Sequence, residues 1–449
     1  MTQLIGRTTM KTLFASLVLF LMMTSVVFAQ HGIFCSCSHC RSQAAFAERN
    51  INPTTVPPAS GEVESVKKSV SGTPTSSVGA NPQAVFVDFD SATAGADHVY
   101  TASERAQILD RMRIDYGRFD FTFTDTAPAS GVFSTITIND GPSFGIAEDV
   151  DFRNLNFGDN ATVDVNSGAF TSAQFVTLTA NVASHELGHL VGLRHGDSFG
   201  PIGSGIDPNT VGTGAFRPTF PGPLGANETQ FHLMESDGVF VENSVDQFFS
   251  ERSAIRLEFN ESGVVVGEMA GARDSLATAQ VLSLGSLVVP NTIEVGARAG
   301  LGDFDVDAIA VVGSLDSFNE EDFYSFEAEA GDLFNFEVIS TVPGRIFDNI
   351  DPQISILDSS GNLVDYFGQD AFNDDEFESL DSILIDLVLP ETDTYFVRVN
   401  AFSVTDLGDY ELFLHRFNGV AVAIPEPSAI ALGLIAMGMA TRRRRALCA

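Results

Sequence analysis

The sequence predicts an α+β domain followed by an all-β antiparallel sandwich, and three observations support this fold class. The chain has 449 residues, which is too long for one compact core. Segments of period-two alternation and of helical spacing mix between residues 83 and 262, whereas only short alternating segments follow residue 270. We therefore expect one domain at 83–262, a second at 270–417, and a tail on each side.

The N-terminal tail begins with the pattern of a secretory signal peptide. Arg7 and Lys11 form a basic start, an apolar run extends from Leu13 to Phe28, and Ala29 offers a small residue for cleavage. The run is shorter than a typical membrane-spanning helix. Residues 1–29 are therefore expected to be removed on export and to take no part in the fold.

Residues 30–82 are expected to form a disordered pro-segment or linker. The stretch 51–82 is rich in Pro, Ser, Thr and Gly and has almost no large apolar side chains, so it cannot bury a core. The cluster Cys35, Cys37 and Cys40 could bind a metal, form a local disulfide, block an active site in a precursor, or have no catalytic role. No cysteine lies between residues 41 and 447, so no disulfide can cross-link either predicted domain.

The first domain is predicted to contain a mixed sheet and one long helix. Period-two alternation predicts strands at 84–90, 120–125, 134–140, 143–152 and 161–166. Helical spacing predicts helices at 101–119, 171–193 and 244–257, opened by the capping pairs Thr101 with Glu104, Thr171 with Gln174, and Ser244 with Gln247. Residues 196–230 are dense in Gly and Pro and should form a long irregular loop.

The second domain is predicted from alternation alone. Large apolar residues occupy every second position in five short segments, namely 334–338, 354–356, 385–389, 395–399 and 410–414. The sequence DSSGN at 358–362 is a hairpin turn signal after one of them. Short strands separated by turns indicate an antiparallel sandwich.

The stretch NVASHELGHLVGLRHGD at 181–197 carries the chemistry of the first domain. His185 and His189 are four residues apart on the long helix, so both imidazoles project from one face and can bind one zinc ion. Glu186 lies beside the first ligand, where it can act as a general base toward a metal-bound water. Gly192 can end the helix at positive φ, so that His195 returns as a third ligand.

Three histidines are the ligand set of a catalytic zinc rather than of a structural one. A structural zinc is closed by four protein ligands, whereas a catalytic zinc keeps one position for water. The extended pattern H-E-x-x-H-x-x-G-x-x-H would arise by chance in about one in 10⁵ chains of this composition. Asp197, two residues after the third histidine, could hydrogen-bond a ligand imidazole.

The segment HELGHLVGLRH resembles the extended zinc motif of the metzincin metallopeptidases. The family also has a methionine-bearing turn beneath the zinc, and Met234 in HLMES is similarly placed. The resemblance covers residues 83–260 and implies zinc ligation by the three histidines, general-base action by Glu186 and a hydrophobic platform from Met234. Ser236 stands where some groups of the family have a tyrosine ligand, so the subfamily, matrixin-like or serralysin-like, stays open.

The second domain resembles the bacterial pre-peptidase C-terminal domain. The segments EDFYSFEAEAGD (321–332), DPQISILDSSGNLV (351–364) and GDYELFL (408–414) carry this resemblance. Domains of this family are small β-sandwiches that accompany secreted peptidases. The resemblance therefore implies an exported protease context.

The C-terminal tail, 424–449, resembles the PEP-CTERM sorting tag of Gram-negative bacteria. The motif Pro425-Glu426-Pro427 is followed by an apolar run at 429–440 and by four arginines at 442–445. The tag implies export, transient membrane anchoring through the apolar helix and cleavage by a sortase-like processing enzyme. The alternative is an ordinary tail anchor. We expect the protein to be secreted or on the cell surface of a Gram-negative bacterium.

The charge balance excludes one class of partner and suggests a second cation. Acidic residues outnumber basic ones by 59 to 24, which argues against binding nucleic acid. Asp303, Asp305 and Asp307 alternate in GDFDVDA. In a loop these three carboxylates could chelate calcium, and in a strand they would form its solvent-exposed polar face.

These patterns predict a secreted zinc endopeptidase that acts on a protein or peptide substrate. We expect the substrate to lie along an edge strand near SFGIAEDV, with the loop 196–233 shaping the adjacent pocket. The alternative is a catalytically inactive cell-surface binding or adhesion protein with a metallopeptidase fold. The presence of Glu186 favours the enzyme, because an inactive fold does not require this carboxylate.

Overall fold

The structure is a computed structural model that describes residues 83–417, apart from 142–143, 167–169, 199–201, 204–231, 236–246, 272, 293, 297–301, 343–345, 347–348 and 377–378. The predicted signal peptide, pro-segment with its cysteines and sorting tag lie outside the described residues. So do Ser244, Ser236 and most of the predicted loop 196–230.

The first domain is built on a five-stranded mixed sheet with the order β2-β1-β3-β5-β4. Its strands are β1 (Gln83–Asp88), β2 (Phe121–Thr124), β3 (Ser134–Ile138), β4 (Phe144–Ala147) and β5 (Asn160–Asp164). The first three and β5 run parallel, whereas β4 is antiparallel to β5 and ends the sheet. Burial alternates along β1 and β3, as expected for strands with one covered face.

The fourth strand is shorter than predicted, because it ends at Ala147 rather than near residue 152. The carboxylate of Asp149 accepts the backbone N–H of Val150, and that of Asp151 accepts the N–H of Asn156. Such local bonds from aspartate side chains compete with the ladder of a sheet. The chain therefore leaves the sheet after Ala147 and forms an acidic loop up to β5.

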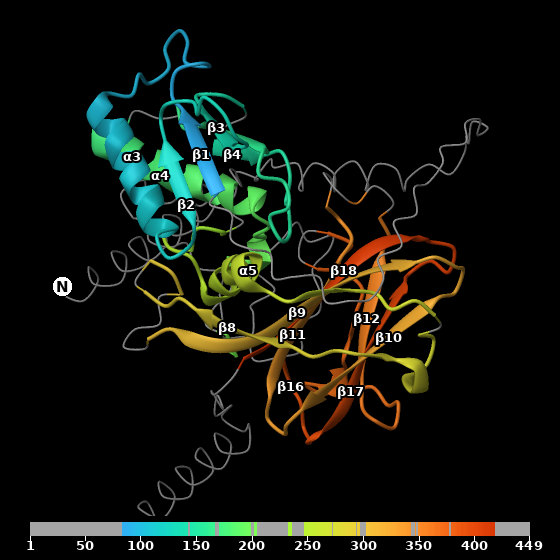
Figure 1. The fold of residues 1–449 in the computed structure, drawn as a ribbon. Helices are drawn as coiled ribbons and strands as arrows, with labels where there is room; N and C mark the ends of the chain where they lie inside the picture. Colours follow the sequence, from blue (N-terminus) through green and yellow to red (C-terminus); the bar gives the residue numbers. More distant parts are fainter. Residues whose placement is uncertain are drawn as a thin grey trace, which may run out of the picture.

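Two helices pack together beside this sheet, α3 (Ala102–Asp115) and α4 (Ser172–Leu190) (Figure 1). Both begin with the predicted capping boxes, at Thr101 and Thr171. The hydroxyl of Tyr116 donates to the backbone oxygen of Ser184 over 2.8 Å, which joins the end of α3 to the middle of α4. The sheet and the capping pairs thus fix the direction of the long helix.

The third predicted helix, 244–257, is found later in the chain, as α5 (Glu251–Ser262). Its N-cap is Ser250, whose side chain accepts from the N–H of Ser253. The helix cannot include Phe248 and Phe249, because their backbones form bridges with His232 and Val295. Figure 1 shows α5 between the first domain and the sandwich.

The second domain is a sandwich of two sheets with the orders β15-β12-β17-β10-β7 and β16-β11-β18-β9-β6. Its strands are β6 (Val265–Gly267), β7 (Gln280–Val281), β8 (Gly285–Val289), β9 (Phe304–Leu315), β10 (Glu321–Ala328), β11 (Leu333–Ile339), β12 (Pro352–Leu357), β15 (Phe372–Asn373), β16 (Ser382–Val388), β17 (Asp393–Ala401) and β18 (Gly408–Phe417). A further pair, β13 (Asp365–Tyr366) with β14 (Gln369–Asp370), lies apart from both sheets.

The prediction of a purely antiparallel sandwich starting at residue 270 needs correction on two points. The short edge strands β6 and β7 pair parallel with β9 and β10, because each enters its sheet through a connection from outside it. Strand β6 begins at Val265, two residues after Gly263 caps α5, so the sandwich starts before residue 270. All the other strand pairs described in the sandwich are antiparallel.

The core of the first domain continues into the sandwich. The ring of Phe413 on β18 lies 5.2 Å from Phe152 and 4.8 Å from Phe259, measured between centroids. A second core fills the space between the two sheets of the sandwich. Among the described residues, no helix has both the length and the apolar character to cross a membrane.

Candidate metal centre

The structure brings the three predicted histidines together. His185 and His189 project from α4, and His195 opens the four-residue turn η1 (His195–Ser198). The Nε2 atoms are 3.1 Å apart for His185 and His189, and 3.2 Å apart for each of the other two pairs. Within the described part of the chain, these three residues form the one group of histidine, cysteine or acidic side chains close enough to share an ion.

Hydrogen bonds fix which nitrogen of two imidazoles faces the cluster. The Nδ1 of His185 contacts the backbone oxygen of Leu233, and the Nδ1 of His189 lies 2.9 Å from that of Leu193. A carbonyl oxygen only accepts, so Nδ1 carries the hydrogen in both rings and Nε2 presents a lone pair. Two such nitrogens 3.1 Å apart cannot hydrogen-bond each other.

This arrangement fits a shared cation. Nitrogen ligands at 2.0–2.1 Å from a tetrahedral zinc ion lie about 3.3–3.4 Å from one another. The observed separations of 3.1 and 3.2 Å are close to that value. Converging lone pairs in a buried site repel each other, whereas a cation at their meeting point reverses the sign of the interaction.

Gly192 ends α4 and returns the chain to the site, as the sequence predicted. Its φ is +88°, a conformation that side-chain-bearing residues rarely adopt. A Cβ at this position would lie 2.6 Å from the Cα of Phe152 and 2.7 Å from the backbone oxygen of Asp151. The backbone N–H of Leu193 donates to the oxygen of Gly188, which reverses the chain so that His195 follows.

Glu186 is buried beside the histidines and against the sheet edge. Its side chain is on α4, and the residue is 2 % exposed. A Cβ added to Gly145 on β4 would lie 2.3 Å from the Oε1 of Glu186. The strand therefore passes directly over this carboxyl, and only glycine leaves room for it. Sequence reasoning missed Gly145, although a glycine inside a strand signals a close approach.

Met234 packs against α4, the helix that carries His185 and His189. It is buried, and a Cβ on Gly188 of α4 would lie 2.5 Å from its Sδ. The adjacent Leu233 supplies the oxygen that orients His185. Next to them, burial lowers the pKa of His232 to about 4, and the contact of its Nδ1 with the oxygen of Ser198 only partly offsets this effect.

The carboxylate of Asp197 contacts groups other than the three imidazoles, contrary to the prediction. Its Oδ2 accepts from the backbone N–H of Arg194 over 2.8 Å and lies 2.9 Å from the Nε of Arg256. Its role is therefore to shape the turn that carries His195. The sequence could not reveal this contact, because Arg256 is 59 residues away on α5.

The three aspartates considered for calcium do not converge. Asp305 and Asp307 lie within β9, and Asp303 directly precedes it. Asp303 forms an ion pair with Arg118 at 2.8 Å, and Asp307 pairs with Arg416. The alternative of a polar strand face is therefore the one observed, since neighbouring arginines neutralise two of the three charges.

Comparison with known proteins gives a match for the sandwich. Residues 320–401 match the family model described as the bacterial pre-peptidase C-terminal domain. No curated protein sequence matches the chain. The predicted resemblance of the second domain is thus confirmed over these residues, which agrees with a protein that works outside the cytoplasm in a protease context.

Two solved structures are similar to part of the chain. One is the pre-peptidase C-terminal domain of a collagenase from Bacillus anthracis, with 18 % identity, 23 % of this chain and 86 % of that chain covered, and a TM-score of 0.18. The other is PliG of Aeromonas hydrophila, a periplasmic inhibitor of g-type lysozyme, with 13 % identity, 24 % and 85 % covered, and a TM-score of 0.18.

Proposed function

We propose that the chain is a secreted zinc endopeptidase whose catalytic domain is metzincin-like. The observation that carries this proposal is the convergence of three buried Nε2 atoms, 3.1 to 3.2 Å apart, beside the carboxyl group of Glu186. Three imidazoles leave one position of a tetrahedral ion for water. A general base next to an open zinc site is the arrangement of a hydrolase.

The residues divide the work of hydrolysis between them. His185, His189 and His195 hold the zinc, which when bound supplies Lewis acidity and lowers the pKa of its water. Glu186 accepts the proton of the attacking water on its carboxylate and gives it to the leaving amine. Met234 supports the helix from below, where its thioether packs on Gly188.

The substrate is proposed to lie along β4. This strand ends the sheet, and its backbone at Gly145 passes over the carboxyl of Glu186. An extended peptide that aligns with an outer strand places its carbonyl groups at regular intervals beside that strand. One of these carbonyls would then lie close to both the histidines and the general base.

Export and surface location belong to the same proposal. A signal peptide at 1–29 and a PEP-CTERM tag at 424–449, cut by a sortase-like enzyme, would deliver the protein to the surface of a Gram-negative bacterium. The family match of the sandwich supports this route, because domains of that description are named for peptidases.

The test replaces Glu186 by alanine in the purified secreted protein. We expect cleavage of casein or gelatin to fall by about 10²–10⁴-fold, because the general base is removed, while one zinc per chain is retained. Glu329→Ala, at an exposed turn residue of the sandwich, is the matched control and should cleave like the wild type. Undiminished proteolysis by the Glu186 variant would contradict the mechanism.

A zinc-binding wild type that cleaves neither protein would instead favour the inactive surface-binding alternative. A chelator provides the complementary arm, since it should stop cleavage by the wild type and excess zinc should restore it.

A further inference from the structure

The turn that carries the third histidine is tied to the β-sandwich by buried ion pairs. Arg194 directly precedes His195, and its side chain is 3 % exposed. Its Nη2 lies 2.6 Å from the Oδ2 of Asp381. Its Nη1 lies 3.4 Å from the Oε1 of Glu337 and 3.6 Å from the Oε1 of Glu376. All three carboxylates belong to the sandwich.

Asp381, the carboxylate nearest to Arg194, is held in place by the backbone of the sandwich. Its Oδ1 accepts the backbone N–H groups of Ser340 and Thr341 at 2.8 and 3.0 Å. Burial by itself would lower the pKa of Arg194, but the charges of Asp381, Glu337 and Glu376 outweigh that effect and raise it. The guanidinium is therefore a permanent cation held by a carboxylate that the sandwich backbone keeps in place.

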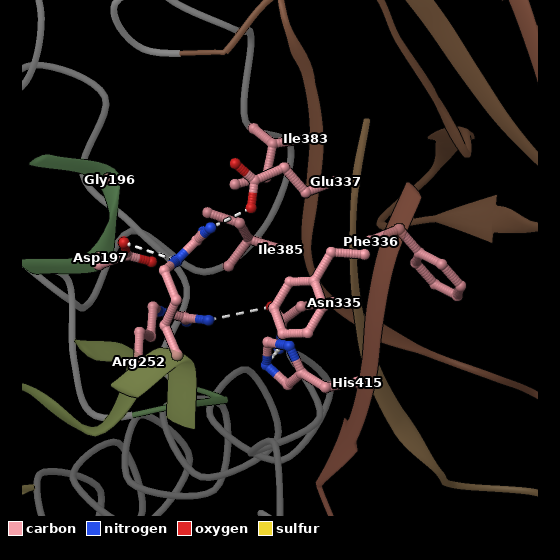
Figure 2. Close-up of a pocket in the computed structure, with 11 residues that line it drawn as sticks. Gly196, Asp197, Arg252, Asn335, Phe336, Glu337, Ile383, Ile385 and His415 are labelled. Atoms are coloured by element: carbon pink, nitrogen blue, oxygen red, sulfur yellow. Dashed lines mark hydrogen bonds and ion pairs between the residues drawn. The ribbon is translucent and has the colours of Figure 1, made fainter. Parts of the chain in front are cut away.

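A second connection reaches the other end of the turn. Asp197 accepts the backbone N–H of Arg194 and lies 2.9 Å from the Nε of Arg256 on α5. The Nη2 of Arg256 in turn lies 2.5 Å from the Oε2 of Glu337 on β11. Asp197 and Glu337 both line one cavity, with Asp197 to the left of Glu337 in Figure 2, and Arg256 joins the turn to the sandwich through these two contacts.

The two sources of metal ligands differ in how they are supported. His185 and His189 stand on a 19-residue helix, whereas His195 stands on a 3₁₀ turn of four residues. Such a short turn has poor internal hydrogen-bond geometry and depends on outside contacts for its position. The side chains of Arg194 and Asp197 supply outside contacts that lead to the sandwich, whereas His232 and Ser250 contact the backbone oxygens of Ser198 and Asp197 from within the first domain.

We infer that the β-sandwich positions the third metal ligand, with Asp381 as the positioning residue that acts through Arg194. The sandwich then contributes to the geometry of the metal centre. It has to stay attached to the first domain after export if the protein is to keep its full zinc affinity. This inference rests on the proposed zinc site, and it adds a function for the second domain.

The experiment measures zinc affinity rather than hydrolysis, on the full-length secreted chain. Asp381→Asn keeps the size of the side chain, and its oxygen can still accept from Ser340, but the charge facing Arg194 is lost. We expect zinc affinity, from competition with a chromophoric chelator, to fall by about 10–100-fold. The visible absorption of the Co²⁺-loaded variant should also change, because it reports the geometry of the three imidazoles.

Asp386→Asn is the matched control. Asp386 is also buried on the sandwich and pairs with Arg252 of α5 at 3.0 Å, which is a different ion pair from those that join Arg194 to Asp381, Glu337 and Glu376. We expect this variant to lose stability and to keep the zinc affinity of the wild type. An equal loss of zinc affinity in both variants would mean a general loss of stability and would overturn the inference.

Glu376→Gln keeps the test decisive if Asp381→Asn does not fold. Its carboxylate is the farther partner of Arg194, at 3.6 Å, so a smaller loss of zinc affinity of a few fold is expected. Wild-type affinity in every folded variant would overturn the inference without touching the proposed function. A wild type that binds zinc but cleaves no protein would contradict the proposed function and leave this inference standing.

Discussion

Two buried polar clusters lie next to each other in this molecule, and they are built on opposite principles. In the first, three imidazoles converge with their Nε2 atoms 3.1 to 3.2 Å apart. In the second, Arg194, Arg252 and Arg256 are paired with carboxylates of the sandwich at 2.5 to 3.6 Å. One cluster gathers groups of the same kind, and the other pairs opposite charges.

Under the proposed function, the difference separates a site that binds an added cation from one that pairs opposite charges within the chain. Buried opposite charges attract each other, and each arginine of that cluster has a carboxylate partner within the chain. The converging imidazole nitrogens instead suit a cation supplied from outside, as the proposed function requires. The two clusters therefore predict opposite responses to the loss of one member and to the addition of zinc.

The largest expected effect comes from breaking the compensated cluster with Arg252→Met. This change leaves the buried carboxylate of Asp386 without its guanidinium, which lies 3.0 Å away in the wild type. Removal of one partner of a buried pair costs about 3–5 kcal/mol. Urea unfolding should show this loss equally with and without zinc.

Arg113→Met is the control for that variant. Arg113 pairs with Asp110 at 2.7 Å on the exposed side of α3, and such pairs contribute only about 0–1 kcal/mol. A loss below about 1 kcal/mol for Arg252→Met would show that the cluster between the domains is not a compensated one.

The histidine cluster should respond to zinc instead. For the wild type, zinc at a thousandfold excess over its dissociation constant should stabilise the fold by about 4 kcal/mol. His189→Leu should abolish this increment, because one of three ligands is gone, while the metal-free variant should unfold close to the metal-free wild type. The measurement is the unfolding midpoint with zinc and with a chelator.

His98→Leu serves as its control, since His98 contacts Glu104 at 3.3 Å and lies outside the histidine cluster. It should keep the full response to zinc. A zinc response that survives His189→Leu would refute the contrast between the clusters.

A smaller effect is expected from the space beside Glu186. Gly145→Ala places a methyl group 2.3 Å from the Oε1 of Glu186, so the carboxyl has to move. A shift of this kind in a catalytic group can reduce the rate by about 10²-fold. Casein cleavage should fall accordingly while zinc affinity is unchanged.

Gly302→Ala is the matched control, because a Cβ there meets nothing within 4 Å. Its cleavage rate should equal that of the wild type. If Gly145→Ala loses zinc affinity as well as cleavage, the substitution has disturbed the three histidines rather than Glu186 alone, which would contradict the prediction.

Local patterns predicted much of the fold and the histidine cluster. The capping boxes at Thr101 and Thr171 depend on residues three apart, and the contact of His185 with His189 depends on one helical turn. The motif also required Gly192 to turn, and its φ of +88° follows from a local rule. These features lie within reach of a short window of sequence.

What the sequence did not predict depends on contacts between distant segments. The start of α5 is set by bridges from Phe248 and Phe249 to residues elsewhere in the chain. The pairing of Arg194 with Asp381 joins residues 187 apart, and a single arginine before a ligand histidine gives no signal of it. The need for glycine at position 145 follows from the side chain of Glu186, which lies beside it only in the folded chain.

The smallest expected effect is a pH dependence that belongs to the arginine cluster. His415 on β18 accepts from the Nδ2 of Asn335 at 3.0 Å, and Figure 2 shows the two side chains facing each other. Burial, together with the charges of Arg252 and Arg256, lowers the pKa of His415 to about 3.

The sign of the effect follows from where the proton binds. An unfolded histidine has a pKa of about 6.5, so below that pH the unfolded chain binds a proton that the folded chain refuses. The contribution of His415 is therefore complete above pH 6.5 and is lost as the pH falls toward 3, by about 1.4 kcal/mol at pH 5.5. The variant His415→Gln can still accept from Asn335 but cannot titrate. Urea unfolding at pH 7.5 and 5.5 should show the wild type losing about 1.4 kcal/mol more than this variant between the two pH values. An equal loss in both proteins would contradict the prediction, because it would mean that His415 becomes protonated inside the fold. It would follow that the field of the neighbouring arginines at His415 is balanced differently from what the ion-pair distances indicate.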